Sequence, residues 1–451
     1  MTLGAIFMLG GVTGAGAEDV SSLWSGSGLS GFEGSLPSLP QNWADLPFHL
    51  TANQAVQYNS NLFNTPTFSS SALSNPLLGH LQPVGGFLST TNLTFSTVFR
   101  LYQEQFFADG TYGLYRYINQ ANENRTHNSS DVGMNWVAGQ RCSGKLVFAA
   151  ASQPSSLGEQ LGANSINTVT TKSFNETANC IISGNWSATL NSGLSKSTNT
   201  TTLDQSNNFQ NAFVAAGINY NLTQTNTLSV LGTLSHYNYP DRLSAFENEL
   251  SILGESADLD TLPFLASSIT VEQVNVSYTR NINPNLSFIA SAGVAGATSS
   301  GVGSSVTNGG GFSGFQPQFT LSGKWLVTPK LTLSGTVGRV VSPPTGTIGN
   351  IQTNETAAMT VSYALTPKVS LSAGASVNRQ TSGVGTNPSV LLQTLFPNLT
   401  QTRNYGLNAG VNYAITPFTT ASLTYQYSDR HQTDEATTNN IVMLALTYAP
   451  H

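Results

Sequence analysis

A recurring turn constrains the fold of this chain more than any other feature. Four segments carry an aromatic residue, a branched apolar residue two positions later, and then a turn that contains Thr; a looser fifth copy runs from Tyr278 to Phe288. Three copies read Thr-Pro at the turn, where proline suits a tight reversal but would break a central strand. Each copy therefore predicts a β-hairpin tip with an aromatic residue at a fixed distance from it. These aromatics are Tyr220, Tyr278, Trp325, Tyr363 and Tyr413.

The segments between these turns alternate with a strict period of two. From Asn404 to Ile415, Asn and Gly fill nearly all of one face, and large apolar residues fill most of the other. The same pattern runs from Ala358 to Arg379, with Ser and Thr on the polar face. That polar face would make a poor dry core, so the pattern disfavours a soluble sandwich and favours strands between lipid and water. The aromatics then form a girdle at one membrane interface.

Composition supports a membrane barrel. Only 8% of the 451 residues are charged, against roughly 25% in an ordinary soluble domain. After the first seventeen residues, no apolar run approaches the ~18 residues of a spanning helix. A closed barrel is the other structure that satisfies all backbone groups in lipid. A chain so poor in Lys and Arg is not expected to bind nucleic acid.

The order of turns predicts an all-β fold, a transmembrane antiparallel up-and-down barrel of about eighteen strands, with sixteen as the alternative. Long connections are expected near 240–266, 298–313, 342–355, 380–402 and 429–440. Before residue 200, strands are expected near 48–58, 92–102, 106–118, 131–139, 143–152, 167–181 and 186–196. The even count predicts a bacterial outer-membrane location with both termini periplasmic.

The chain divides into three predicted parts. Residues 1–17 are interpreted as a signal peptide, because an apolar stretch ends in Ala15-Gly16-Ala17, although no basic residue precedes it. Residues 18–46 are expected to form a periplasmic extension, and residues 47–451 the barrel.

The two cysteines are predicted to form a disulfide. Cys142 would begin a rising strand and Cys180 would end the next, descending strand, so the two meet at the periplasmic rim. Free thiols and metal ligation are the alternatives, but no His cluster lies near in the sequence. We therefore predict no metal site.

The inward face is expected to be neutral, with the few charges mostly in turns, loops and rims. Such a lining favours an uncharged cargo such as a glycan, although ordinary wetting of a wide pore explains it equally well. The segments Ser299–Gly314 and Asp241–Pro263 could fold inward as constrictions or remain solvated loops. The predicted lining residues are Thr332, Ser334, Thr336, Ser370, Ser372, Asn404, Asn408, Asn412, Thr420, Ser422, Thr424 and Gln426.

Two arginines end outward rows of apolar residues. Arg339 and Arg379 both fall at the predicted extracellular end. A charge there can reach lipid head groups, so we predict contact with anionic lipopolysaccharide; the alternative is an arginine facing water at a loop boundary.

The segment from His49 to Pro66 resembles the first-strand motif of the β-barrel porin 2 family, with Tyr58, Asn59, Asn61 and Phe63 at the motif positions. The Leu-Thr-Pro-Lys turns and the segment from His236 to Arg242 resemble that family too. Two departures are Asn59, where the family commonly has Asp, and an end at His451 rather than at an aromatic residue. The resemblance implies an outer-membrane barrel, and some relatives are linked to exopolysaccharide export.

The predicted function is a conduit for an uncharged or weakly charged polysaccharide, or a general diffusion porin. The alternatives are a plugged barrel that acts as an adhesin or structural protein, and a secreted repeat-type β protein. Neither a catalytic motif nor a cofactor site is predicted. The expected partners are outer-membrane lipids and lipopolysaccharide, the barrel-assembly machinery, and polysaccharide with periplasmic export components.

Overall fold

The computed structural model describes the strands of a barrel wall and some of the connections between them. It describes residues 48–61, 67–68, 85–118, 124–154, 167–201, 205–242, 244, 267–300, 315–342, 352–382, 401–431 and 435–449. The predicted signal peptide and the periplasmic extension lie outside the described residues.

Eighteen long strands make up the wall, once the two-residue β2 (Thr67–Phe68) is set aside. One short 3-10 helix, η5 (Gln205–Asn207), precedes β9. In chain order the long strands are β1 (Phe48–Asn59), β3 (Gly86–Leu101), β4 (Glu104–Tyr117), β5 (Arg125–Ala138), β6 (Cys142–Pro154), β7 (Thr168–Ser183), β8 (Trp186–Asn199), β9 (Phe209–Thr223), β10 (Asn226–Asn238), β11 (Ser268–Asn283), β12 (Leu286–Ser300), β13 (Gln316–Thr328), β14 (Leu331–Ser342), β15 (Gln352–Ala364), β16 (Val369–Ser382), β17 (Gln401–Thr416), β18 (Thr419–His431) and β19 (Glu435–Tyr448).

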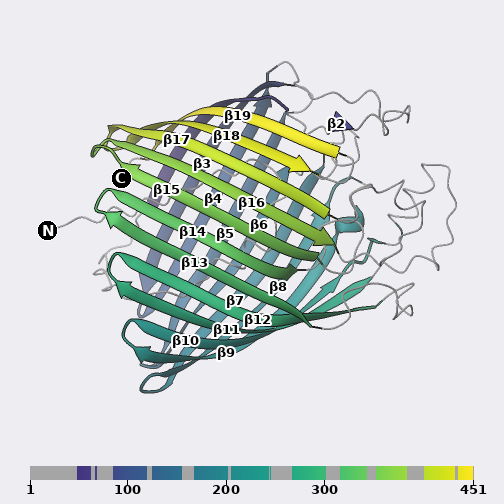
Figure 1. Ribbon diagram of the computed structural model, residues 1–451, viewed down its shortest axis with the longest axis vertical. Helices are drawn as coiled ribbons and strands as arrows, with labels where there is room; N and C mark the ends of the chain where they lie inside the picture. The colour runs from purple at the N-terminus through teal and green to yellow at the C-terminus, as the bar shows by residue number, and fades with distance from the viewer. Residues whose placement is uncertain are drawn as a thin grey trace.

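The sheet closes on itself. From β3 onward each long strand pairs antiparallel with the next, while β1 pairs with β3 on one side and with β19 on the other (Figure 1). The predicted eighteen-strand barrel is therefore confirmed, and the sixteen-strand alternative is wrong. No helix in the described part of the chain is long and apolar enough to cross a membrane.

The two ends of the barrel differ. Turns of two to four residues join the strands at one end, and β1 begins and β19 ends there (Figure 1). The other end carries the longer connections. One of these was placed wrongly: β18 runs to His431 and β19 starts at Glu435, so the expected long connection at 429–440 is strand for most of its length.

The Thr-Pro turns owe their shape to the threonine as well as to the proline. The Thr328 hydroxyl accepts hydrogen bonds from the backbone N–H groups of Lys330 (3.3 Å) and Leu331 (3.1 Å). Thr366 accepts in the same way from Lys368 (3.2 Å) and Val369 (3.0 Å). A side-chain acceptor two or three residues before the donor is the ST-turn that proline's fixed φ also favours.

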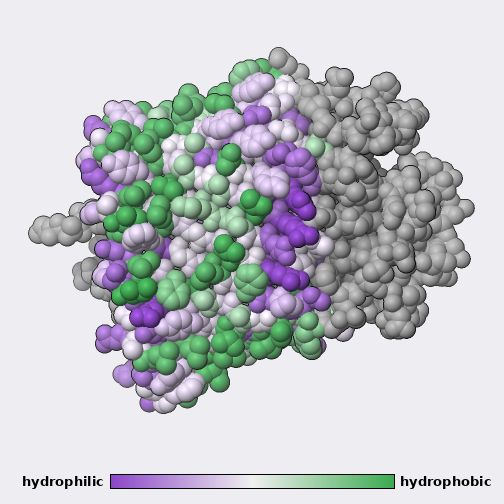
Figure 2. All heavy atoms as spheres, viewed as in Figure 1, coloured by the Kyte–Doolittle hydropathy of each residue, from purple (hydrophilic) through white to green (hydrophobic). Residues whose placement is uncertain are grey.

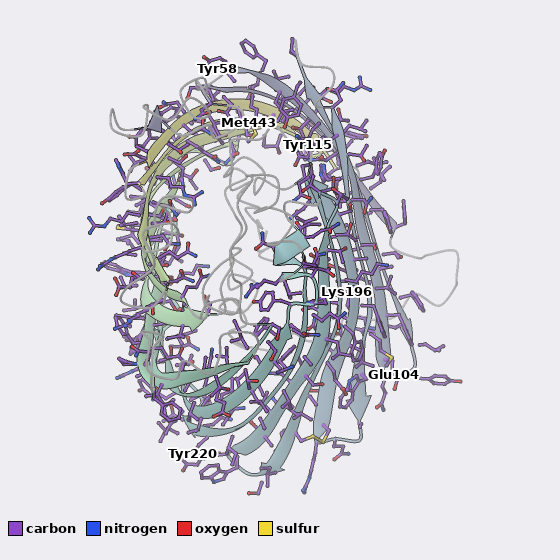
Figure 3. All side chains as sticks on the ribbon, turned by 90° about the vertical axis from the view of Figure 1, so that its right-hand side faces the viewer. Tyr58, Glu104, Tyr115, Lys196, Tyr220 and Met443 are labelled. Carbon is purple, nitrogen blue, oxygen red and sulfur yellow. A yellow bond between two sulfur atoms is a disulfide. The ribbon has the colours of Figure 1, made fainter. Side chains whose placement is uncertain are left out.

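The apolar surface lies outside rather than in a core. Most large apolar side chains of the strands are exposed, and Figure 2 shows them as a hydrophobic band around the near wall. Viewed along the barrel, Tyr58 and Tyr220 lie on the outside of the wall and Tyr115 and Met443 on the inside (Figure 3). The alternation therefore turns the polar residues inward, as the period of two predicts.

Candidate functional site: the inward face of the barrel

All twelve predicted lining residues lie on the inward face. Residues directly opposite in neighbouring strands share a face, and Ser370 lies opposite Asn412, which lies opposite Ser422. Ser334 and Thr336 belong to the same face through the pairing of β14 with its neighbours. The residues between them, such as Leu407 with 54% of its surface exposed, point outward.

Glycines on this face make room for amides. A Cβ on Gly374 would lie 2.7 Å from Oδ1 of Asn408, which is directly opposite. Further along the same pair of strands, the Asn412 amide donates a hydrogen bond to the Ser370 hydroxyl at 3.4 Å. The inward face from β14 to β18 therefore carries closely spaced neutral hydrogen-bonding groups, and among its described residues the charged exception is Arg430, opposite Asn404 near the end with long connections.

The opposite wall is charged in its middle, so the expectation that charge is confined to turns, loops and rims is wrong there. Asp109 on β4 lies directly opposite Asp131 on β5, and Lys145 on β6 shares their inward face. The Lys145 ammonium stands 4.7 Å from the ring centroid of Phe107. Figure 1 shows β4–β6 behind β14–β18, so the charged and neutral walls face each other across the lumen.

A further cation lies on the neutral side. Lys324 on β13 lies opposite Ser334 and faces inward. It borders an open groove whose lining includes the hydroxyl groups of Ser287, Ser322 and Thr360 as well as apolar residues such as Ile289. The groove joins a cation to several hydroxyls, a combination that can bind a hydrated solute by hydrogen bonds.

The first residues after β10 fold back onto the inner wall at the long-connection end. Arg242 is 1% exposed, and its Cζ atom lies 3.6 Å from the centroid of the Tyr239 ring. Tyr239 packs in turn against Ile269 and Val271. Burial raises the pKa of Tyr239 and lowers that of Arg242, while each group partly offsets the other's shift. This contact secures the start of the Asp241–Pro263 connection; the rest of that connection lies outside the described residues.

Asparagines tie the same region to its neighbours. Asn167 donates to Oδ1 of Asn199 (2.9 Å), and Asn199 donates to Oδ1 of Asn208 (3.1 Å). Asn208 donates to the Asp241 carboxylate at 2.7 Å. Three connections at the long-connection end are thereby fastened together by side chains that the lining prediction did not include. The sequence indicated these contacts only through an Asn at or near the end of each strand, which is too weak a pattern to predict them.

The five predicted girdle aromatics all lie near the end with short turns. Tyr220 and Tyr278 both flank Leu228, from the two sides of β10. Trp325, Tyr363 and Tyr413 lie on the outward face, each exposed. Trp186, whose ring lies 4.5 Å from that of Tyr220, extends the girdle; it was missed because it follows its turn, whereas the repeat places the aromatic residue before the turn.

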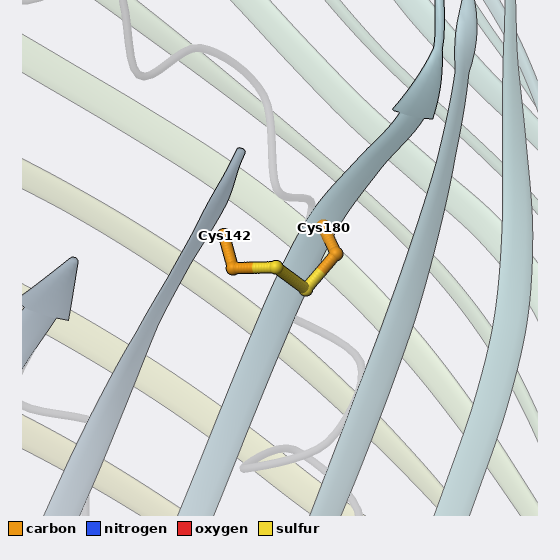
Figure 4. The surroundings of a disulfide bond; sticks show 2 residues. All are labelled: Cys142 and Cys180. Atoms are coloured by element: carbon orange, nitrogen blue, oxygen red, sulfur yellow. A yellow bond between two sulfur atoms is a disulfide. The ribbon is translucent and has the colours of Figure 1, made fainter. Parts of the chain in front are cut away.

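The two cysteines face each other directly. Cys142 at the start of β6 lies opposite Cys180 on β7, with 4.1 Å between the Cα atoms, and the two form a disulfide (Figure 4). The bond lies at the end with short turns, where the sequence placed it. No group of His, Cys, Asp and Glu that could hold a metal occurs within the described ranges.

The motif residues lie at the far end of the first strand. Tyr58 is exposed, while Asn59 and Asn61 are buried, and the Asn59 side chain accepts a hydrogen bond from the Asn61 backbone N–H at 2.8 Å. The neighbouring Ser60 pairs with the backbone of Asn440 on β19. Phe63 lies outside the described residues. In this structure the motif shapes a turn beside the line where the barrel closes.

The two predicted lipid-contact arginines share an outward face and one neighbour. Arg339 and Arg379 both lie opposite Glu355, and Arg379 pairs with its carboxylate at 3.5 Å. The Ser299–Gly314 segment is described only as far as Ser300, where β12 ends.

No family model matches the chain, so its resemblance to the β-barrel porin 2 family stays a prediction. No curated protein matches it either. Among solved structures, OccK1 (OpdK) of Pseudomonas aeruginosa is 9% identical, covers 90% of this chain and 98% of its own, and has a TM-score of 0.44. OprD of the same organism is 10% identical, with coverages of 90% and 95% and a TM-score of 0.44. The siderophore receptor PirA of that organism is 8% identical, with coverages of 92% and 82% and a TM-score of 0.45. Similarity this distant says nothing about what the chain transports or binds.

Proposed function

We propose that this chain is a bacterial outer-membrane channel through which small hydrophilic solutes diffuse. The observation that carries the proposal is the division of the eighteen-strand wall into an apolar outer face and a hydrogen-bonding inner face. Barrels of this strand number are wide enough for an aqueous path. A dry structural barrel would have little use for Asn, Ser and Thr at most inward positions of β14–β18.

The first strand begins and the last strand ends at the end with short turns, which supports a periplasmic position for that end. The longer connections, together with the Tyr239–Arg242 contact, would then face the outside of the cell. Lipid, lipopolysaccharide and the barrel-assembly machinery are the partners that this location requires.

The cargo we propose is neutral or weakly charged, because the inward face of β14–β18 is built mostly from hydroxyl and amide side chains, whereas Asp109, Asp131 and Lys145 lie on the opposite wall. Saccharides fit the hydroxyl-rich lining. Export of a polysaccharide, which the family resemblance implies, draws no support from the described residues, and we propose the broader class of solutes instead.

Planar-bilayer conductance of the purified, refolded barrel tests the proposal. Stable unitary currents, together with swelling of proteoliposomes in a neutral monosaccharide, are expected. A correctly folded barrel is recognised by its faster gel migration before heating. Absence of current from such a barrel would favour the alternative of a plugged adhesin or structural protein.

Membrane fractionation and a protease-accessible tag after residue 451 test the location. The protein should sediment with the outer membrane, and the tag should be cut only after the periplasm is opened. Cutting on intact cells would contradict the proposed orientation.

A further inference from the structure

Five ionisable residues form one line across the outer wall, which we call the arginine row. Arg339 lies opposite Glu355, and Glu355 lies opposite Arg379. Arg379 lies opposite Arg403, and Arg403 lies opposite His431. The row crosses five consecutive strands, β14 to β18, within a few residues of the end with long connections.

The row marks the upper edge of the apolar outer face. One step along the same face toward the short turns come Val337, Val377 and Tyr405, all exposed apolar or aromatic side chains. Figure 2 shows a hydrophilic stripe across the near wall at this edge, beside the hydrophobic band. Charges at this height sit where lipid acyl chains give way to head groups.

The charges in the row do not balance. Glu355 binds Arg379 at 3.5 Å, and the His431 ring pairs with the Asp429 carboxylate at 2.8 Å. Arg403 makes no ion pair with any other described residue, and it lies directly opposite another arginine. Like charges in direct cross-strand opposition destabilise a sheet. The row therefore carries three guanidinium groups and one carboxylate, and Arg379 and Arg403 are exposed on the outer surface, where an outside anion can reach them.

The chemistry of the row suits phosphate. Guanidinium groups bind phosphate oxygens through paired hydrogen bonds. Neighbouring strands lie about 4.8 Å apart, so the three steps from Arg339 to Arg403 span about 14 Å. A head group with two phosphates on a disaccharide can lie along such a length, whereas a single inorganic phosphate would engage only part of it.

We infer that the arginine row binds the phosphate groups of a phosphorylated glycolipid in the outer leaflet, with Arg379 and Arg403 as its main contacts. The inference rests on the proposed outer-membrane location, and it does not depend on solute passage through the lumen. Arg339 and Arg379 were expected from the sequence to meet such lipid; Arg403, His431 and the register that aligns them come from the structure.

The test uses the full chain with Arg339→Gln, Arg379→Gln and Arg403→Gln combined. A matched control carries Arg280→Gln, Lys330→Gln and Lys368→Gln, which remove the same charge at the end with short turns. The measurement is the amount of lipopolysaccharide that co-purifies with each barrel, per mole of protein. The row variant should retain about tenfold less than the wild type, because each lost guanidinium removes charged hydrogen bonds to phosphate, while the control should match the wild type.

Refolded barrels provide a second readout. Diphosphorylated lipid A should raise the unfolding midpoint of the wild type and of the control but not that of the row variant, and lipid A stripped of phosphate should have no effect. Equal retention by the wild type and the row variant would overturn the inference, as would an equal stabilisation by phosphate-free lipid A. A midpoint shift of the same size from phosphatidylglycerol would also overturn it, since the row would then be a general anion site.

If the triple variant does not fold, the single variant Arg403→Gln provides the test of the inference. Its removal breaks no ion pair among the described residues, so folding should persist. A barrel that folds with Arg403→Gln and retains as much lipopolysaccharide as the wild type would contradict the inference.

Discussion

Asp109 on β4 lies directly opposite Asp131 on β5, with both carboxylates on the inner face of the barrel. Two acids in cross-strand opposition cost stability, and Lys145 on the next strand offsets only part of that charge. The arrangement therefore does not stabilise the sheet. In a channel, it places negative charge where ions pass.

The first prediction concerns ion selectivity. Replacing both acids, Asp109→Asn with Asp131→Asn, should shift the reversal potential in a salt gradient toward anion preference. A unit charge a few ångströms from a permeating ion in water is worth about 1 kcal/mol, or about fivefold in the permeability ratio. Asp429→Asn, on the outer face, is the control and should leave the potential unchanged. An unchanged potential in the double variant would show that ions avoid this wall.

The second prediction concerns the disulfide. Replacing Cys142 and Cys180 with serine should lower the free energy of unfolding by roughly 2–4 kcal/mol, since the bond closes a loop of 38 residues in the unfolded chain. Urea titration with gel mobility as the readout measures the loss. Reductant should lower the wild-type midpoint and leave the variant unaffected. Recovery of both cysteines as free thiols in non-reducing mass mapping would contradict the bond itself.

The third prediction concerns the threonine at the Thr-Pro turns. Thr366→Val keeps the side-chain shape but removes the acceptor for two backbone N–H groups, so unfolding should become easier by about 1 kcal/mol. Thr366→Ser retains the hydroxyl and should behave like the wild type. Equal unfolding midpoints for the valine and serine variants would show that the threonine hydroxyl does not stabilise the turn, and that proline alone does.

The fourth prediction concerns pH. Burial raises the pKa of Tyr239 above its ordinary value of 10.0, so the folded protein holds this proton more tightly than the unfolded chain. The stabilisation is complete below about pH 10 and declines as the pH rises further. Tyr239→Phe should therefore show a smaller loss of stability between pH 9 and 11 than the wild type. Tyr102→Phe, at a fully exposed turn position, is the control and should follow the wild type.

The sequence alone predicted the strand number because the C-terminal half repeats one hairpin, with Pro329, Pro367 and Pro417 at its turns. It failed where strands rise above the lipid and become polar on both faces. The stretch Arg125–Ser130 was left out of the expected strand at 131–139 for that reason, although β5 begins at Arg125. The stretch Glu435–Asn440 was missed likewise at the start of β19.

The lining residues could be assigned from alternation, but their relation across strands could not. Asp109 lies two positions before Thr111, so alternation along the strand could have predicted that both face inward. Its position opposite Asp131 depends on the register between β4 and β5, which alternation does not give. Arg379 and Arg403 meet across a connection that runs from 383 to 400, and no local pattern fixes a register over that distance.

The pairing between the first strand, β1, and the last strand, β19, affects how fast the barrel can close. Asn53 on β1 donates a hydrogen bond to the Thr447 hydroxyl at 2.8 Å, across 394 positions of the chain. Ring closure on that scale is entropically slow. Until β19 pairs with β1 and β18, one edge of each of these two strands is unpaired and can pair with another chain. A chain that lacks the fourteen residues of β19 would therefore expose two unpaired strand edges and tend to aggregate, rather than form a slightly smaller barrel.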